Sequence, residues 1–173
     1  MIKLIIVDDH EVVRTGLKQI FDDTSDIKVV DEAGSGQEFI EKARKGDFDT
    51  ALLDISMPGK DGIDTLKELR QVNPKINVLV FTMYPEEQYA VRVIKAGASG
   101  YLNKECKPSE LKEAIRKIAT GRKYISPDLA ELLASTLESG DGTPLHETLS
   151  DREFQVMYMI ASGKTISEIA DEL

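Results

Sequence analysis

Polar side chains that could do chemistry follow four short apolar segments of the chain. They are Asp8 and Asp9 after Leu4–Val7, Asp54 after Ala51–Leu53, Thr82 after Val78–Phe81, and Asn103-Lys104 after Tyr101–Leu102. If these segments are strands of one parallel sheet, their carboxyl ends meet in the crevice at one edge. Three carboxylates gathered there repel one another unless they take up protons or a cation lies among them. Such a set of oxygen ligands favours Mg²⁺.

Residue types suited to binding an anion stand beside the carboxylates. Lys104 supplies a positive charge and Thr82 a hydroxyl donor, which an anionic phosphoryl group needs on its oxygens. Asp54 is the best candidate for a nucleophile that accepts this group as an acyl phosphate, because it stands alone while Asp8 and Asp9 form a pair suited to a metal ion. The alternative is that Asp8 or Asp9 only caps a helix, Asp54 starts a turn and Lys104 is solvated.

Strands and helices alternate over about the first 120 residues. Amphipathic segments at helical spacing separate short apolar runs, which are Leu4–Val7, Ile27–Val30, Ala51–Leu53, Val78–Phe81 and Tyr101–Leu102. Five strands alternating with five helices predict an α/β fold with a doubly wound parallel sheet. In the flavodoxin-like order 2-1-3-4-5, strand one lies beside strand three, and the polar strand ends converge.

The chain changes character after Gly121, which closes the last of these helices. Ser126-Pro127 reads as an N-cap and a first helical residue, so a linker helix is expected over about 127–137. Residues 138–144 are rich in turn formers and poor in apolar residues, which predicts a hinge.

Two capping-box patterns follow the hinge. Ser150-x-x-Glu153 and Thr165-x-x-Glu168 each open a short helix. The pair suits a helix-turn-helix, and a plain helical hairpin is the alternative. The expected domains are residues 1–121, a linker over 122–146, and an incomplete all-α helix-turn-helix segment over 147–173.

Composition excludes several classes of protein. The chain has 173 residues, of which 31 are acidic and 22 basic, and its formal net charge is −9. Residues 121–173 carry −6 of this charge. Their negative charge opposes nonspecific binding to nucleic-acid phosphates. The single cysteine, Cys106, excludes an internal disulfide, and the two histidines are too few for a Cys/His zinc cluster. No apolar run could span a bilayer and no cleavable leader is seen, so we expect a cytoplasmic protein without a membrane partner.

The candidate residues stand in segments that resemble a known family. The segments are Val7-Asp8-Asp9-His10, Leu53-Asp54-Ile55-Ser56-Met57-Pro58-Gly59-Lys60-Asp61-Gly62, Thr82, and Gly97-Ala98-x-Gly100-Tyr101-Leu102-x-Lys104. In content, order and spacing they resemble the receiver domain of two-component response regulators, over residues 1 to about 120. Similarly, Leu149-Ser150-x-Arg152-Glu153 and Ile160-Ala161-x-Gly163-Lys164-x-Ile166-x-Glu168-Ile169-Ala170 resemble the start of a LuxR/NarL-type DNA-binding domain.

The resemblance implies a role for each candidate residue. Asp54 is the phosphoacceptor, Asp8, Asp9, Asp54 and the Ser56 backbone carbonyl hold Mg²⁺, Thr82 and Lys104 contact the phosphoryl group, and Thr82 and Tyr101 are switch residues. A sensor histidine kinase is the implied phosphodonor. Thr82 then turns toward the phosphoryl oxygens, Tyr101 fills the vacated space, and homodimerisation follows.

The resemblance also implies a regulatory phosphoacceptor that is not an enzyme, apart from self-catalysed phosphotransfer and dephosphorylation. Met83 follows Thr82 where the family often has a small residue, so we expect its bulk to alter the lifetime of the phosphate.

The expected function is a phosphorylation-dependent response regulator that, in full-length form, binds DNA as a transcription regulator. The DNA-reading helix of that domain type should follow Leu173, so no DNA-contacting residue is assigned and specific DNA binding by these 173 residues is not expected. One alternative is a stand-alone phospho-switch that binds proteins and not DNA. Another is a haloacid-dehalogenase-like phosphatase, but its Asp-x-Asp on strand one does not match Asp8-Asp9-His10.

Overall fold

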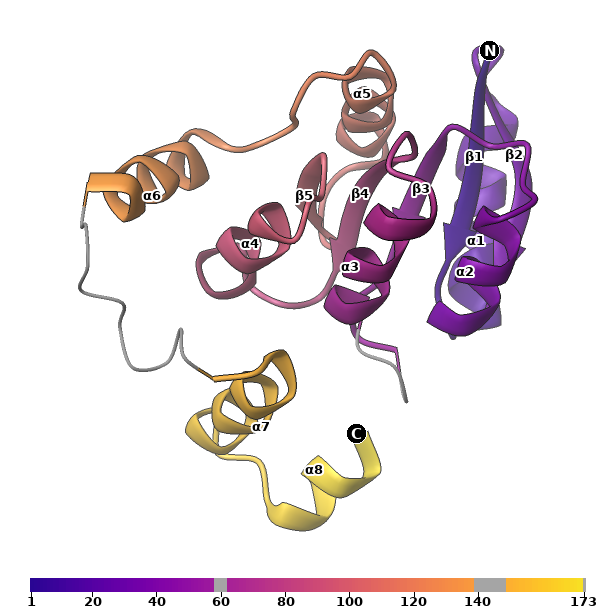
Figure 1. Cartoon of the computed structure of the whole chain (residues 1–173). Helices are drawn as coiled ribbons and strands as arrows, with labels where there is room; N and C mark the ends of the chain where they lie inside the picture. The colour runs from indigo at the N-terminus through magenta and orange to yellow at the C-terminus, as the bar shows by residue number, and fades with distance from the viewer. Residues whose placement is uncertain (58–61, 139–148, 173) are drawn as a thin grey trace.

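The chain is described by a computed structural model, which covers residues 1–57, 62–138 and 149–172. The expected turn at 58–61 and all of the expected hinge except Glu138 lie outside the described residues. Among the described residues, five strands form one sheet with helices on both faces, and further helices follow it in the chain. Figure 1 shows these helices apart from the sheet.

The sheet is parallel, with strand order β2-β1-β3-β4-β5. Its members are β1 (Ile2–Val7), β2 (Ile27–Ala33), β3 (Thr50–Leu53), β4 (Asn77–Thr82) and β5 (Gly100–Asn103). Val7 pairs with Leu53, Leu53 with Val80, and Thr82 with Asn103. This register brings the carboxyl ends of β1, β3, β4 and β5 to one edge, and the fold predicted from the sequence is confirmed.

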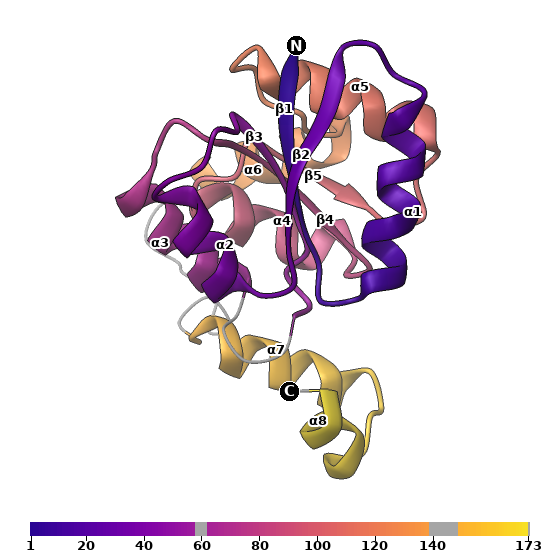
Figure 2. The same ribbon diagram turned by 90° about the vertical axis from the view of Figure 1, so that its right-hand side faces the viewer.

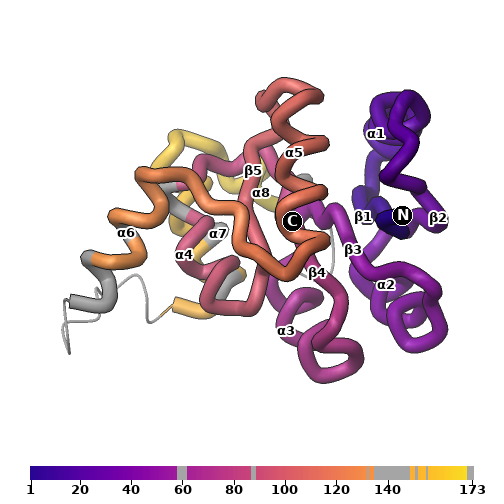
Figure 3. Tube along the Cα trace, turned by 90° about the horizontal axis from the view of Figure 1, so that it is seen from above, coloured from indigo at the N-terminus to yellow at the C-terminus, as the bar shows by residue number. Residues whose placement is uncertain are grey.

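Helices cover both faces of the sheet, as Figure 3 shows from above. On one face lie α1 (Glu11–Asp22) and α5 (Pro108–Ala119), and on the other lie α2 (Gly36–Ala43), α3 (Gly62–Val72) and α4 (Glu86–Lys95). The first face buries Leu17 and Phe21 of α1, and the second buries Phe39 of α2 and Leu66 of α3. Full burial of each such side chain stabilises the fold by roughly 1.5–3 kcal/mol. The packed sheet therefore holds the residues at its edge in defined positions.

The linker helix α6 (Pro127–Glu138) packs against α4. The hydroxyl of Ser126 accepts the Leu129 backbone N–H at 3.0 Å, so Ser126 is the expected N-cap. It also donates a short hydrogen bond to Glu86 at the start of α4. Leu129 and Leu133 join the apolar core on the α4 side of the sheet.

Both capping boxes predicted from the sequence are present at α7 (Asp151–Ala161) and α8 (Ile166–Glu172). The Ser150 hydroxyl accepts the Glu153 N–H while the Glu153 carboxylate accepts the Ser150 N–H at 2.8 Å, and Thr165 and Glu168 repeat the arrangement. Seen from the side in Figure 2, both helices lie beyond the edge at which the strands end. Within the described residues, no helix is long and apolar enough to cross a bilayer.

Candidate functional site

The strand ends hold Asp8 and Asp54 in fixed positions at the edge of the sheet. The Asp8 backbone N–H donates to the Ala33 carbonyl at 3.1 Å, and the Asp54 N–H donates to the Val7 carbonyl at 2.9 Å. Arg14, from the second turn of α1, donates to the Asp8 carbonyl at 2.7 Å. Both aspartates are almost fully buried, with 1% and 3% of their surfaces exposed. Their carboxylates therefore need partners in the fold.

Lys104 is the partner of both carboxylates. Its Nζ lies 2.7 Å from Asp8 Oδ2 and 2.6 Å from Asp54 Oδ2. Burial lowers the pKa of Lys104, but the charges and hydrogen bonds of Asp54 and Asp8 outweigh it, so the pKa is raised above its ordinary value. The ammonium group thus stays charged at neutral pH, at a point where it can also meet an incoming anion.

A pair of hydroxyl groups lies on the other side of Asp54. The Ser56 backbone N–H donates to Asp54 Oδ1 at 2.9 Å, and Ser56 Oγ lies 2.9 Å from Thr82 Oγ1. Thr82 is fully buried. Sequence reasoning gave Ser56 a role only through its backbone carbonyl and missed the hydroxyl contact with Thr82. The sequence does place a hydroxyl-bearing side chain two residues after Asp54, and this feature could have indicated the contact with Thr82.

Asp9 and His10 complete the acidic end of the site. Asp9 Oδ1 is buried and makes no hydrogen bond, although His10 Nδ1 lies 3.0 Å away. Asp8, Asp9 and His10 offer ligand atoms that all lie within 4.8 Å of one another. The imidazole is largely exposed, as expected for a residue at the start of α1. A buried carboxylate oxygen that accepts no hydrogen bond, next to a buried aspartate, fits a cation with oxygen ligands.

Tyr101 and Tyr84 connect the site to α4. Tyr101 is 2% exposed, and its hydroxyl donates to the Tyr84 backbone carbonyl at 2.7 Å. The Tyr84 backbone N–H donates to Thr82 Oγ1 at 3.4 Å. Both residues that the sequence singles out as a switch therefore contact one residue, Tyr84, in the middle of the β4–α4 connection.

Together these groups can bind and accept a phosphoryl group. The site joins a carboxylate nucleophile candidate, a lysine that neutralises charge, a hydroxyl donor and an acidic cluster suited to a hard cation. Of the residues predicted from the sequence, Asp8, Asp54, Thr82 and Lys104 come together at one edge, with Asp9 beside Asp8. The thiol of Cys106 is not part of this chemistry, because burial raises its pKa to about 11 and keeps it protonated.

Residues 4–116 match the family model of the response regulator receiver domain, which is well over half of the chain. The chain is a response regulator. Residues 147–173 also match the model of the luxR family of bacterial regulatory proteins. The family resemblance read from the sequence is thereby confirmed for both parts.

Relatives of the regulator cover most or all of its length. It is 36% identical to the response regulator UvrY of Escherichia coli K12 over 174 residues, which is 100% of this chain and 80% of UvrY. A two-component response regulator of the LuxR family from Aurantimonas is 34% identical, with a TM-score of 0.71 over 78% of this chain and 96% of that one. A structure of two RcsB dimers bound to two parallel DNAs is 26% identical, with a TM-score of 0.69. The match covers 99% of this chain and 82% of the RcsB chain.

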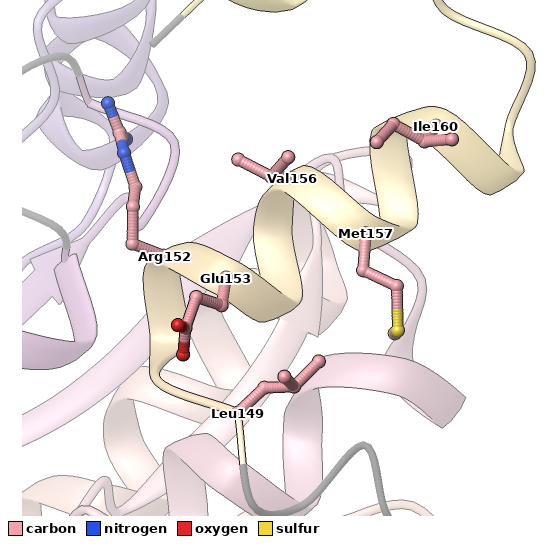
Figure 4. A pocket seen from close by; sticks show the side chains of 6 residues that line it. All are labelled: Leu149, Arg152, Glu153, Val156, Met157 and Ile160. Atoms are coloured by element: carbon pink, nitrogen blue, oxygen red, sulfur yellow. The ribbon is translucent and has the colours of Figure 1, made fainter.

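The luxR-type part of the regulator has an apolar surface along α7. A hollow of about 470 Å³ is lined by Leu149, Arg152, Glu153, Val156, Met157 and Ile160. Figure 4 shows Val156 and Ile160 on one side of the helix and Leu149 and Met157 on another. Met157 and Ile160 are exposed, whereas Phe154 of the same helix is only 6% exposed. Phe154 is covered because α7 packs against α4.

Proposed function

We propose that Asp54 accepts a phosphoryl group from a sensor histidine kinase and that this modification switches the output of the regulator. The observation that carries the proposal is the position of Lys104, whose ammonium group bridges Asp8 and Asp54 at the strand edge where Thr82 also lies. A buried lysine between two carboxylates, with a hydroxyl group beside them, matches the charges and donors that a phosphoryl group on Asp54 requires.

Mg²⁺ is the proposed cofactor. Asp8, Asp9, Asp54 and the backbone carbonyl of Ser56 would hold it, and Asp9 Oδ1, which is buried and accepts no hydrogen bond, supports this assignment. When bound, the ion neutralises negative charge on the phosphoryl oxygens.

Each residue of the site has its own role in phosphoryl transfer and in dephosphorylation. An Asp54 carboxylate oxygen forms a bond to phosphorus while the phosphorus–nitrogen bond of the donor phosphohistidine breaks, and the donor imidazole takes up a proton. Lys104 moves from the Asp54 carboxylate to a phosphoryl oxygen, and the Thr82 hydroxyl donates to another. In dephosphorylation, water attacks phosphorus, releases inorganic phosphate and restores the Asp54 carboxylate. This is the whole of the catalysis proposed for a protein that is otherwise regulatory.

The output is proposed to be homodimerisation and DNA binding. RcsB dimers bind DNA in a related structure, and residues 147–173 match the luxR model. We assign residues 1–121 to the receiver, 122–146 to the linker and 147–173 to the output part, and we place the regulator in the cytoplasm. Tyr101 is the proposed aromatic partner of Thr82 in the switch.

Phosphorylation is tested by intact-mass measurement after incubation with Mg²⁺ and acetyl phosphate. We expect one hydroxylamine-labile phosphoryl adduct on the wild type and none on Asp54→Ala. Size-exclusion chromatography of both samples reports dimerisation. An adduct of equal yield on Asp54→Ala would assign the phosphoacceptor elsewhere, and the absence of an adduct on the wild type would reject the phosphoacceptor proposal for this chain.

Met83 is expected to tune how long the phosphoryl group persists. Met83 directly follows Thr82 in the chain and its side chain is 58% exposed, and we expect its bulk to hinder an attacking water. We expect Met83→Ala to lose its phosphate about two- to tenfold faster than the wild type, equivalent to about 0.4–1.4 kcal/mol in barrier height. Phosphate release after removal of the donor measures this rate. Equal rates in the two proteins would contradict the expectation.

A further inference from the structure

The guanidinium group of Arg70, near the end of α3, is only partly used by the fold. Its Nη1 donates to the carbonyl oxygens of Pro74 and Ile76, at 2.9 and 2.8 Å. Its Nε and Nη2 are buried and form no hydrogen bond. Buried polar atoms of native proteins almost always have a partner, so this pair of donors requires an explanation. We call these two nitrogens the Arg70 fork.

The same pair of nitrogens is fully used by another arginine of this protein. Arg116 of α5 directs Nε and Nη2 at the two carboxylate oxygens of Asp26, at 2.7 and 3.0 Å. This bidentate arrangement matches the planar guanidinium group to two oxygens of a carboxylate or a phosphate. Arg70 has no such carboxylate among the described residues, and burial lowers its pKa. The Arg70 fork therefore has the geometry of an oxyanion site.

A glycine allows Arg70 to lie against the connection between α4 and β5. Gly97 has a φ of +106°, and a Cβ at this position would lie 3.0 Å from Arg70 Cγ and 3.1 Å from its Nε. A side chain here would thus displace the Arg70 fork. Gly97 and Arg70 are both half-buried, so the fork lies close to the surface of the molecule.

A second cation, Lys123, reaches the same connection from the segment after α5. Its ammonium group donates a short hydrogen bond to the carbonyl of Ala98, the residue after Gly97. Burial and the nearby charge of Arg70 lower the pKa of Lys123, and no carboxylate of the described residues opposes them. Lys123 as a whole is exposed, so its flexible side chain can turn toward an anion beside Arg70. Such an anion would relieve the repulsion between the two cations.

We propose that Arg70 and Lys123 form a binding site for a phosphate group, carried by inorganic phosphate or by a small phosphate monoester. The Arg70 fork holds two phosphate oxygens, and the Lys123 ammonium group pairs with a third. Two positive charges suit a doubly charged phosphate better than a singly charged carboxylate. The site lies at the amino ends of β4 and β5, because Ile76 and Ala98 come just before these strands. It is thus at the opposite edge of the sheet from Asp54 and is independent of phosphoryl transfer there.

Phosphate binding is measured by NMR titration of the full 173-residue chain with inorganic phosphate, without Mg²⁺ and at an ionic strength held constant with sodium chloride. We expect saturable shifts of the backbone amide signals of Ile76, Gly97 and Ala98, which lie beside the Arg70 fork. The amide signals of Asp54 and Thr82 report binding at the other edge separately. Shifts that do not saturate, or that are confined to Asp54 and Thr82, would overturn the proposal.

Titrations with other anions identify the ligand class. Acetate should bind at least about fivefold more weakly than inorganic phosphate, because it carries a single negative charge. Acetate of equal affinity would overturn the assignment to phosphate. Glycerol phosphate that binds as tightly as inorganic phosphate would support a monoester as the ligand, whereas clearly weaker binding would support inorganic phosphate.

Substitutions test the two cations separately. Arg70→Lys keeps the positive charge but removes the fork, so its affinity for phosphate should fall about tenfold, the effect of one charge-assisted hydrogen bond. Lys123→Met leaves Arg70 in place and should weaken binding about two- to fivefold. Lys117→Met is the matched control, because Lys117 lies over the Tyr124 ring, 5.3 Å from its centroid. The control should bind phosphate like the wild type.

Arg70 also supports the connection before β4 through its two carbonyl contacts, so thermal unfolding of each variant is recorded beside the titration. Lys123→Met tests the site even where Arg70→Lys does not fold, because Lys123 is on the surface. Wild-type affinity in Lys123→Met, or an equal loss in Lys117→Met, would overturn the proposal. Wild-type affinity in a folded Arg70→Lys protein would overturn it as well.

Discussion

Replacing Lys104 with methionine should lower the free energy of unfolding by about 3 kcal/mol, because it leaves two buried carboxylates without their shared positive partner. Asp8 and Asp54 each hold the ammonium group at 2.7 Å or less, and the Lys104 side chain is only 13% exposed. Since the pKa of Lys104 is raised by folding, the stabilisation is complete at neutral pH and is lost only as the pH rises through that alkaline pKa.

Urea unfolding with and without Mg²⁺ measures the effect. A divalent ion bound by the same carboxylates should recover part of the loss, so Mg²⁺ should stabilise Lys104→Met more than the wild type. Lys3→Met is the matched control, because it removes an ion pair with Asp47 whose carboxylate is 90% exposed, and such pairs contribute about 0.2–1 kcal/mol. Equal losses in the two variants would show that the buried bridge is not the source of stability.

Gly62→Ala should damage the loop after Asp54 although it adds a single methyl group. A Cβ at Gly62, the first residue of α3, would lie 2.3 Å from the Ile55 Cα and 2.7 Å from its Cβ. Ile55 stands between Asp54 and Ser56, so its backbone must shift, and the contact between Ser56 and Thr82 shifts with it. We expect a loss of about 2–3 kcal/mol in the free energy of unfolding and slower adduct formation with acetyl phosphate.

Gly16→Ala is the control for the same substitution in a helix. No heavy atom lies within 4 Å of the added Cβ in the middle of α1, so alanine should stabilise the protein by about 0.5–1 kcal/mol through its helix propensity. Thermal unfolding of the two variants therefore should move in opposite directions. A stable Gly62→Ala protein with wild-type phosphorylation would show that the loop accommodates the methyl group.

The fold and the centre of the site follow from local sequence patterns. Five short apolar runs predicted the five strands, and a polar residue at the end of a parallel strand can only lie at the shared edge. The meeting of Asp54 and Lys104, which are 50 residues apart in the sequence, therefore follows from the strand pattern alone. The capping boxes at Ser150 and Thr165 were equally local, since each depends on two residues three positions apart.

The contacts beyond the sheet edge could not be predicted in this way. Tyr89 and Phe154 look like ordinary apolar residues of two separate helices, and nothing in their spacing indicates that they meet. Their contact depends on the orientation of α7 relative to α4, which is set by side chains on both helices rather than by periodicity in either. The buried position of Tyr101 is likewise a tertiary property, fixed by the backbone of Tyr84.

The bridge from Lys104 to Asp8 joins residues 96 positions apart, at the beginning and near the end of the sheet. On the ribosome, Asp8 emerges first, and at about 5–20 residues per second Lys104 follows roughly 5–20 s later. During that interval Lys104 is absent, so burial of the two negative carboxylates of Asp8 and Asp54 is unfavourable. Water can solvate both carboxylates as long as the strand edge stays open. We therefore expect the nascent sheet to close when β5 emerges, so that the fold and its reactive site are completed in the same step of synthesis.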